Sequence, residues 1–210
     1  MATVTFSRLP SAVALAACVT SIAVTVAACG SDSSAPSASP SATGPAVAST
    51  VTQAAGPDGT CPTAPPANAG TPEWTLPGAT GAVAVTGSTD TSAPVVTVTA
   101  PFSVTATQVQ TLQAGSGPVV APTATVSVCY MGVNGRDGRV FDSSYQRGEA
   151  VDFPLDGVVP GFQKAIAGQK VGSTVAVAMV SADGYPDGQP RAGILPGDTL
   201  VFAIKILSAS

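Results

Sequence analysis

Short runs in which apolar and polar residues alternate start near Trp74 and continue to the end of the chain. Gly, Pro, Asp and Asn separate these runs, as turns separate antiparallel strands. The alternation predicts strands over residues 95–99, 108–113, 126–130, 175–180 and 200–207. One short helix is predicted to begin at Pro160, because proline suits the first helical position, and to end at Gly168.

The phase of the strands indicates which face of the sheet this helix covers. The bulky side chains that share one face are Val126, Val128 and Tyr130 in one strand and Phe202, Ile204 and Ile206 in another. A helix this short is stable only when its apolar side is buried. We therefore expect it to pack on the face of Tyr130 and Phe202, which leaves Cys129 on the opposite face.

The chain starts with a segment typical of an export signal: after Arg8, residues 9–28 carry no charge and are mostly apolar. They lead into Val26-Ala27-Ala28-Cys29, which resembles a bacterial lipobox, a motif whose cysteine receives a lipid. We therefore expect a signal peptide over 1–28, lipidation of Cys29 and an extracytoplasmic protein anchored to the cell membrane. A similar sequence ending at Cys18 and an uncleaved membrane anchor are the alternatives.

Residues 29–70 are composed almost entirely of Ala, Ser, Thr, Pro and Gly, with no Leu, Ile, Met or aromatic residue. Such a segment buries too little apolar surface to offset its loss of chain entropy, so a disordered linker is expected. It serves either as a stalk for O-linked sugar or as a passive tether. Cys61 within it can reach Cys129; in an exported protein the two most simply pair, and two free thiols are the alternative.

Composition excludes several classes of function. The chain has no histidine, which excludes Ser-His-Asp and Cys-His catalysis and histidine-ligated metals. Its net charge of -4 offers no basic surface for nucleic acid. No cofactor and no metal are expected. The sequence Asn134-Gly135-Arg136-Asp137-Gly138 contains oxygen ligands suited to calcium, but Asn-Gly between two strands is more economically explained as a hairpin turn.

Five segments carry a family resemblance: 126–133, 140–144, 153–155, 158–162 and 196–202. In this order and spacing, over roughly residues 105–208, they resemble FKBP-type peptidyl-prolyl cis-trans isomerases. The resemblance implies an α+β fold, an antiparallel β-sheet wrapped around one short α-helix, in a domain over 105–210. Residues 71–104 lie outside it and are expected to add strands to the edge of the sheet. Without the resemblance, the phenylalanines would be interpreted as ordinary core packing.

The resemblance also implies the residues of a proline-binding pocket. Those matching catalytic positions are Tyr130, Phe141, Asp142, Val159, Tyr185 and Phe202, and those matching substrate-binding positions are Val158, Phe162, Ile194 and Phe153. Two departures stand out. Phe162 replaces a tryptophan found in many members, and Pro186 and Pro190 leave the path of the segment 184–195 undefined. The implied partners are proline-containing polypeptides and macrolide inhibitors.

The chemistry so implied needs no histidine. Rotation about an X-Pro bond has a barrier of about 20 kcal/mol, because the nitrogen lone pair is delocalised into the carbonyl. A dry apolar pocket withholds water from the planar amide and so favours the twisted one. The resemblance implies that the Val159 N–H and the Tyr185 hydroxyl hold substrate acceptors, while Asp142 orients its neighbours. The expected function is isomerisation of X-Pro bonds during folding of exported proteins. The alternatives are a catalytically weak proline-binding or chaperone module at the cell surface, and a display scaffold.

Overall fold

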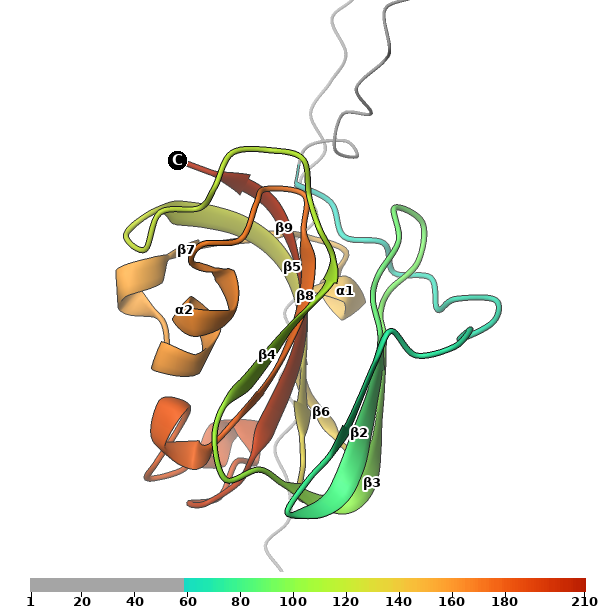
Figure 1. Cartoon of the computed structure of the whole chain (residues 1–210), viewed down its shortest axis with the longest axis vertical. Helices are drawn as coiled ribbons and strands as arrows, with labels where there is room; N and C mark the ends of the chain where they lie inside the picture. Colours follow the sequence, from blue (N-terminus) through green and yellow to red (C-terminus); the bar gives the residue numbers. More distant parts are fainter. Residues whose placement is uncertain (1–58) are drawn as a thin grey trace, which may run out of the picture. The chain divides into compact units, whose positions relative to one another are not determined.

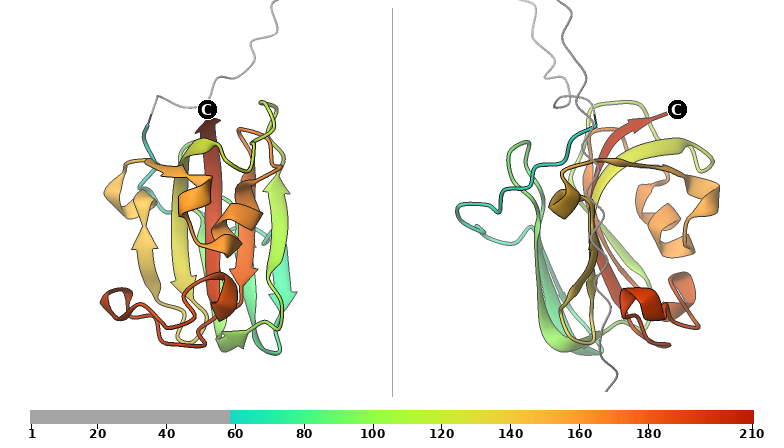
Figure 2. Two further views of the ribbon diagram at one scale, coloured as in Figure 1. Left: turned by 90° about the vertical axis from the view of Figure 1, so that its left-hand side faces the viewer. Right: turned by 180° about the vertical axis from the view of Figure 1, so that it is seen from behind.

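The computed structural model describes residues 59–210, which form two β-sheets packed face to face with a helix on the outer face of the larger sheet (Figures 1 and 2). The predicted signal peptide, Cys29 and residues 29–58 of the predicted linker lie outside the described residues. No helix within 59–210 has both the length and the apolar character needed to cross a bilayer.

The larger sheet has six strands, all paired antiparallel, in the order β4-β8-β9-β5-β6, with β7 paired to β5. Its strands are β4 (Gln108–Gln113), β5 (Thr125–Asn134), β6 (Val140–Ser143), β7 (Val151–Pro154), β8 (Thr174–Met179) and β9 (Leu200–Ala209). The strands predicted from alternation are confirmed, and β5 extends four residues beyond its predicted end. Residues 134–138, which begin with the Asn-Gly pair, form the predicted hairpin turn between β5 and β6. A hydrogen bond of 2.8 Å from the Gly138 N–H to the Asn134 carbonyl closes this turn.

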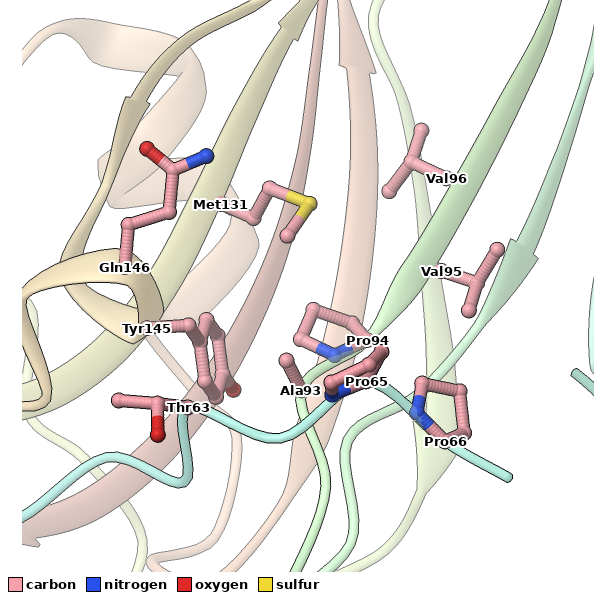
Figure 3. A pocket seen from close by; sticks show the side chains of 10 residues that line it. All are labelled: Thr63, Pro65, Pro66, Ala93, Pro94, Val95, Val96, Met131, Tyr145 and Gln146. Carbon is pink, nitrogen blue, oxygen red and sulfur yellow. The ribbon is translucent and has the colours of Figure 1, made fainter. Parts of the chain in front are cut away.

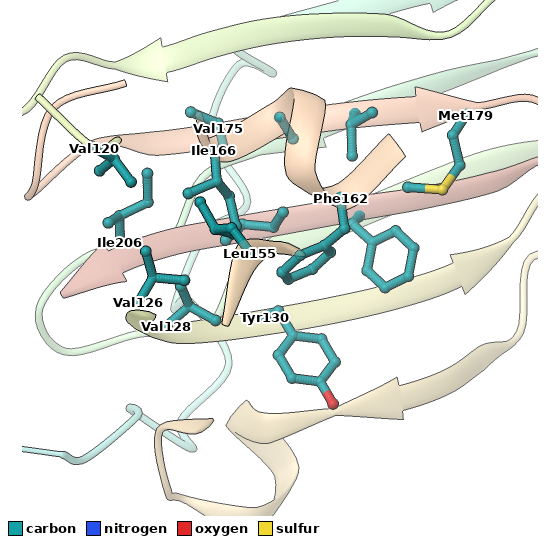
Figure 4. Close-up of a cluster of buried hydrophobic side chains, with 14 of the residues drawn as sticks. Val120, Val126, Val128, Tyr130, Leu155, Phe162, Ile166, Val175, Met179 and Ile206 are labelled. Carbon is teal, nitrogen blue, oxygen red and sulfur yellow. The ribbon is translucent and has the colours of Figure 1, made fainter. Parts of the chain in front are cut away.

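Helix α2 (Pro160–Ile166) lies on the face predicted for it. It begins at Pro160 and is followed by Gly168, whose φ of 82° is strained for any other residue. Its buried residues include Phe162, Ala165 and Ile166, which pack on the side chains of β5, β8 and β9 (Figure 4). The predicted fold class, an antiparallel sheet with one short helix, is therefore confirmed.

A one-turn helix, α1 (Ser144–Arg147), was not predicted. The Ser143 hydroxyl caps its start by accepting a hydrogen bond from the Gln146 N–H, and Gly148 ends it in the left-handed conformation. Three single 3-10 turns complete the helical content of residues 59–210: η1 (Leu155–Gly157), η2 (Ser181–Asp183) and η3 (Pro190–Ala192).

The strands β1 (Trp74–Pro77), β2 (Thr80–Thr86) and β3 (Val95–Ser103) form a separate three-stranded sheet. The prediction that residues 71–104 extend the edge of the larger sheet is therefore wrong. They cover its second face instead, because β8 and β9 are apolar on both sides and that face also needs burial. The buried residues at this contact are Val83, Val85, Phe102, Ala176, Ala178, Val201 and Ala203.

Residues 59–66, here called the strap, join the two sheets. A disulfide links Cys61 to Cys129 on the face of β5 opposite α2, which is the pairing predicted. The Cys61 N–H donates to the Gly148 carbonyl at 3.0 Å, and the Ala93 N–H donates to the Ala64 carbonyl at 2.8 Å. The folded part of the chain thus begins before the predicted boundary at residue 71. The composition of the strap predicts disorder, because it has no large apolar side chain. The disulfide and the backbone hydrogen bonds hold it in place instead.

Candidate active site

Five aromatic rings from five different elements meet on the helix side of the larger sheet. They belong to Tyr130 of β5, Phe141 of β6, Phe153 of β7, Phe162 of α2 and Phe202 of β9. Ring centroids lie 5.5 Å apart for Phe162 and Phe202, 5.6 Å for Phe153 and Phe162, and 5.5 Å for Phe141 and Phe202. All three contacts are edge-to-face, the arrangement that aromatic quadrupoles favour.

Gly132 of β5 allows two of these rings to close over the strand. A Cβ atom at Gly132 would lie 2.6 Å from Phe141 Cζ and 2.8 Å from Phe202 Cε1, far closer than such atoms can approach. The missing side chain at this position therefore lets Phe141 and Phe202 pack against the backbone.

Three rings of the cluster are buried and two are partly exposed. Tyr130, Phe162 and Phe202 are only 5–6% exposed. Phe141 and Phe153 are half-buried at the surface. The other apolar residues predicted for the pocket also pack against this core: Val158, Val159 and Tyr185 are partly exposed, and Ile194 is buried. The structure thus brings together the aromatic and aliphatic residues predicted for the site.

Two hydrogen-bond donors on residues that pack against this core have no partner within residues 59–210. Val159 precedes α2, and its N–H makes no hydrogen bond there. The Tyr185 hydroxyl, beside the same core, makes none either. Both are predicted substrate-binding donors, and both are available to a ligand.

Asp142 lies at the edge of the cluster between Tyr130 and Arg147. The Tyr130 hydroxyl donates to one carboxylate oxygen, and Arg147 Nη1 donates to the other at 2.5 Å. Arg147 Nη2 also donates to the Tyr130 hydroxyl oxygen at 3.1 Å. Arg147 is not among the residues predicted for the site. The signal for it was the Ser143 cap and the Gly148 stop, which together form the turn that carries Arg147 back toward Asp142.

These contacts shift the pKa values of the two acids in opposite directions. Burial, and after it the hydrogen bond to Asp142, raises the pKa of Tyr130 to about 12. Burial alone would raise the pKa of Asp142, but hydrogen bonds from Tyr130 and Arg147 outweigh it and lower that pKa overall. Near neutral pH the carboxylate is therefore charged and the phenol is protonated.

We expect the rate of the proline isomerisation that the family resemblance implies to vary little between about pH 5 and about pH 9, because neither acid changes charge there. Because its pKa is lowered, the Asp142 carboxylate stays charged until the pH falls below the range in which an ordinary aspartate titrates. Tyr130, with its raised pKa, loses its proton only above pH 10. The rate on a proline tetrapeptide, measured across this range with stability followed in parallel, checks this. A bell-shaped profile centred near neutrality would contradict it.

Replacement of Arg147 by Met is expected to lower kcat/KM about threefold, since the ion pair it removes is exposed and worth at most about 1 kcal/mol. Arg147 acts as a positioning residue for Asp142, whose pKa it lowers. The acid limb of the pH profile should therefore move to higher pH in Arg147→Met. Arg139→Met, an exposed arginine in the turn between β5 and β6, is the matched control. An unmoved acid limb would contradict the positioning role.

A buried carboxylate anchors the loop that carries Tyr185 and Ile194. Asp198 is 8% exposed. It accepts hydrogen bonds from Asn134 Nδ2 at 2.7 Å, the Leu195 N–H at 2.8 Å and Arg136 Nε at 3.1 Å. The loop is therefore tied to the β5–β6 turn.

The two prolines in this loop are accommodated locally. Pro190 begins η3, and on either side of that turn Gln189 pairs with Ile194 through backbone hydrogen bonds. Pro186 is exposed and follows Tyr185 without displacing it from the core. The path that the sequence leaves undefined is thus a closed turn.

Comparison with known proteins agrees with this geometry. Residues 117–207 match the family described as FKBP-type peptidyl-prolyl cis-trans isomerase. A probable FK506-binding protein of Corynebacterium glutamicum is 40% identical over 96 residues, which are 45% of this chain and 80% of that protein. The FKBP-type 22 kDa peptidyl-prolyl cis-trans isomerase of Escherichia coli is 38% identical over 100 residues, 48% of each protein.

Among solved structures, the crystal structure of FkpA from Escherichia coli shares 36% identity and covers 50% of this chain and 48% of that one, with a TM-score of 0.47. The chain thus spans about half the length of these Escherichia coli relatives and most of the Corynebacterium one. Because the Corynebacterium protein is 40% identical and 80% of its length is covered, the chain belongs to the FKBP-type peptidyl-prolyl cis-trans isomerase family.

Proposed function

We propose that this isomerase acts outside the cytoplasm, attached to the cell membrane through a lipid on Cys29, on proline-containing segments of exported proteins. The observation that supports the catalytic part is the aromatic cluster, together with two unpartnered donors on Val159 and Tyr185, which pack against the same core. The location rests on the uncharged segment 9–28 and the lipobox-like sequence that follows it.

The cluster suits rotation of an imide bond without proton transfer. A substrate proline ring would rest on Phe162, between Tyr130 and Phe202, where water cannot solvate the amide oxygen. Loss of that solvation disfavours the planar amide more than the twisted one, which lowers the barrier by differential binding. The Val159 N–H and the Tyr185 hydroxyl would hold carbonyl groups of the peptide, each worth about 1 kcal/mol.

The test is an isomerisation assay of the full chain on a proline tetrapeptide. We expect acceleration that the macrolide FK506 blocks by filling the aromatic cluster. Absence of acceleration at micromolar enzyme would reject the catalytic proposal. Inhibition should be competitive with the peptide, because both ligands need the same rings.

Tyr185→Phe should lower kcat/KM about fivefold, because it removes one hydrogen bond worth about 1 kcal/mol. Tyr145→Phe is the matched control. Its hydroxyl donates to the Ser88 hydroxyl at 2.8 Å on the other side of the larger sheet. We expect the control to retain its activity. Equal loss in both variants would mean that the Tyr185 hydroxyl has no role in substrate binding.

A second candidate function, gripping proline segments without turnover, is favoured by the departures at Pro186 and Pro190 in the loop beside Ile194. The same assay separates the two functions, since FK506 binding without acceleration indicates a binding module.

Membrane attachment has its own test. Mass analysis of the mature protein should find a diacylglyceryl group on Cys29, and Cys29→Ala should move the protein from the membrane to the soluble fraction. A mature protein whose first residue is not Cys29 would contradict the proposed lipid anchor.

A further inference from the structure

A cavity of about 310 Å³ (Figure 3) lies on the side of the larger sheet opposite the aromatic cluster. Ten residues line it, from the strap, the loop before β3, the start of β3, β5 and α1. Met131 belongs to the lining and directly follows Tyr130 in β5. Because side chains alternate across a strand, the two residues face opposite sites. The volume is at the lower end of the range of about 300–1,000 Å³ typical of ligand pockets.

The lining of this cavity indicates an apolar ligand. It includes no charged side chain, and three prolines, Pro65, Pro66 and Pro94, contribute apolar rings and no N–H donor. The Tyr145 hydroxyl is occupied by its hydrogen bond to Ser88. An uncharged, mainly apolar group is therefore the chemistry that complements this surface.

The walls of the cavity are held in place before any ligand arrives. The disulfide between Cys61 and Cys129 fixes the strap to β5, and the hydrogen bond from Ala93 to Ala64 fixes it to the loop before β3. A preformed pocket loses little conformational entropy on binding.

Beside the cavity runs an unpaired strand edge. Val95 and Val96, the first residues of β3, line the cavity. Within the part of the chain that the structure describes, β3 pairs only with β2, and no backbone hydrogen bond is made on the other side of residues 95–100. Such an edge is a template for an added strand from an extended peptide.

Helix α1 lies between the two sites. Gln146 lines the cavity, and the next residue, Arg147, hydrogen-bonds to Tyr130 at the aromatic cluster. A polypeptide that occupies the cluster therefore needs only to pass over α1 to reach the cavity. Once one segment is bound, the effective concentration of its neighbour at the cavity is high.

We propose that this cavity and the β3 edge form a second binding site for an extended, uncharged, apolar segment of the same client polypeptide whose proline occupies the aromatic cluster. The segment adds a strand to β3 and places one apolar side chain in the cavity. This inference rests on the proposed function. With this second site the protein binds non-native polypeptides in addition to isomerising their X-Pro bonds.

The probe is a fluorescent, proline-free and uncharged peptide, acetyl-Ser-Val-Thr-Val-Thr-Val-Ser-amide, titrated into the full chain. Val95→Lys places a charge at the cavity, and Pro66→Glu does so from the strap. Each should weaken peptide binding about tenfold or more. Thr75→Lys, on β1 at the far edge of the same sheet, should leave it unchanged. Rates on a proline tetrapeptide, which spans only the aromatic cluster, should stay within about twofold of wild type in all three.

A refolding protein whose slow step is proline isomerisation provides the second readout. Its catalysed rate should fall about fivefold or more in Val95→Lys and Pro66→Glu, but not in Thr75→Lys. A photo-crosslinking residue at position 95 then identifies the occupant. Crosslinks to the added peptide support the proposal. Crosslinks to residues 1–58 of the same chain, or to a second copy, overturn it.

Failure here is distinguishable from failure of the proposed function. If the tetrapeptide is isomerised but the proline-free peptide neither binds nor crosslinks, only the second site is rejected. If the tetrapeptide is not isomerised, the catalytic proposal is rejected as well.

Discussion

Phe141→Ala is expected to lower kcat/KM for a proline tetrapeptide about a hundredfold, equivalent to about 3 kcal/mol of transition-state stabilisation. Phe141 is half-buried and closes the cluster against Phe202, with the ring centroids 5.5 Å apart. Its removal admits water to the place where the amide oxygen must be kept dry, so the planar amide regains its solvation. Because the ring is half-exposed, we expect the protein to stay folded, at a cost below the about 3–5 kcal/mol of a fully buried Phe→Ala change.

Two variants of the same strand serve as controls for Phe141→Ala. Phe141→Leu keeps an apolar cover and should retain about a tenth or more of the activity. Val140→Ala changes a neighbouring side chain that is 40% exposed and does not belong to the cluster, and should behave as wild type. Near-normal turnover by Phe141→Ala, with urea unfolding showing a native protein, would remove the basis for a water-excluding site at this cluster.

Removal of the disulfide is expected to lower the free energy of unfolding by about 4 kcal/mol. The bond joins residues 68 positions apart and so restricts a long loop in the unfolded chain. It also holds the strap, which has no large apolar side chain of its own. The double change Cys61→Ala with Cys129→Ala, compared with wild type by urea unfolding, measures the effect. Tetrapeptide isomerisation below the transition should persist, because the disulfide lies on the other face of the sheet.

Wild-type protein unfolded in excess dithiothreitol is the matched control and should reproduce the urea midpoint of the double variant. A wild-type midpoint that dithiothreitol leaves unchanged would show that the bond does not stabilise the protein. A loss seen with the double variant alone would instead point to packing of the cysteine side chains, which are 4% and 1% exposed.

The position of the helix can be predicted from the sequence because side chains alternate along a strand. Val126, Val128 and Tyr130 all lie in the core beneath α2, while Cys129 faces the strap. The aromatic cluster could be proposed only from the family resemblance, since no periodicity brings Phe141 and Phe202 together. Arg147 is not predictable this way, because its contact with Tyr130 depends on the unpredicted turn α1.

The location of residues 74–103 is harder to predict. Whether extra strands pair with an edge or stack on a face depends on contacts between residues far apart in sequence. One signal was present in β8, where Ala176 and Ala178 alternate with Val175 and Val177, so that neither face is polar. Strands of this kind are covered on both sides. The separate sheet supplies the cover on the second side.

That two-sided burial determines where the chain can be shortened. The segment matched to the family, 117–207, omits β4 and the whole three-stranded sheet that covers the second face of the larger sheet. A fragment trimmed to that match would expose a continuous apolar surface to water, formed by Ala176, Ala178, Val201 and Ala203. Such surfaces drive aggregation. Recombinant production therefore needs a chain that starts before Cys61, so that the shielding sheet and its covalent tie are both retained.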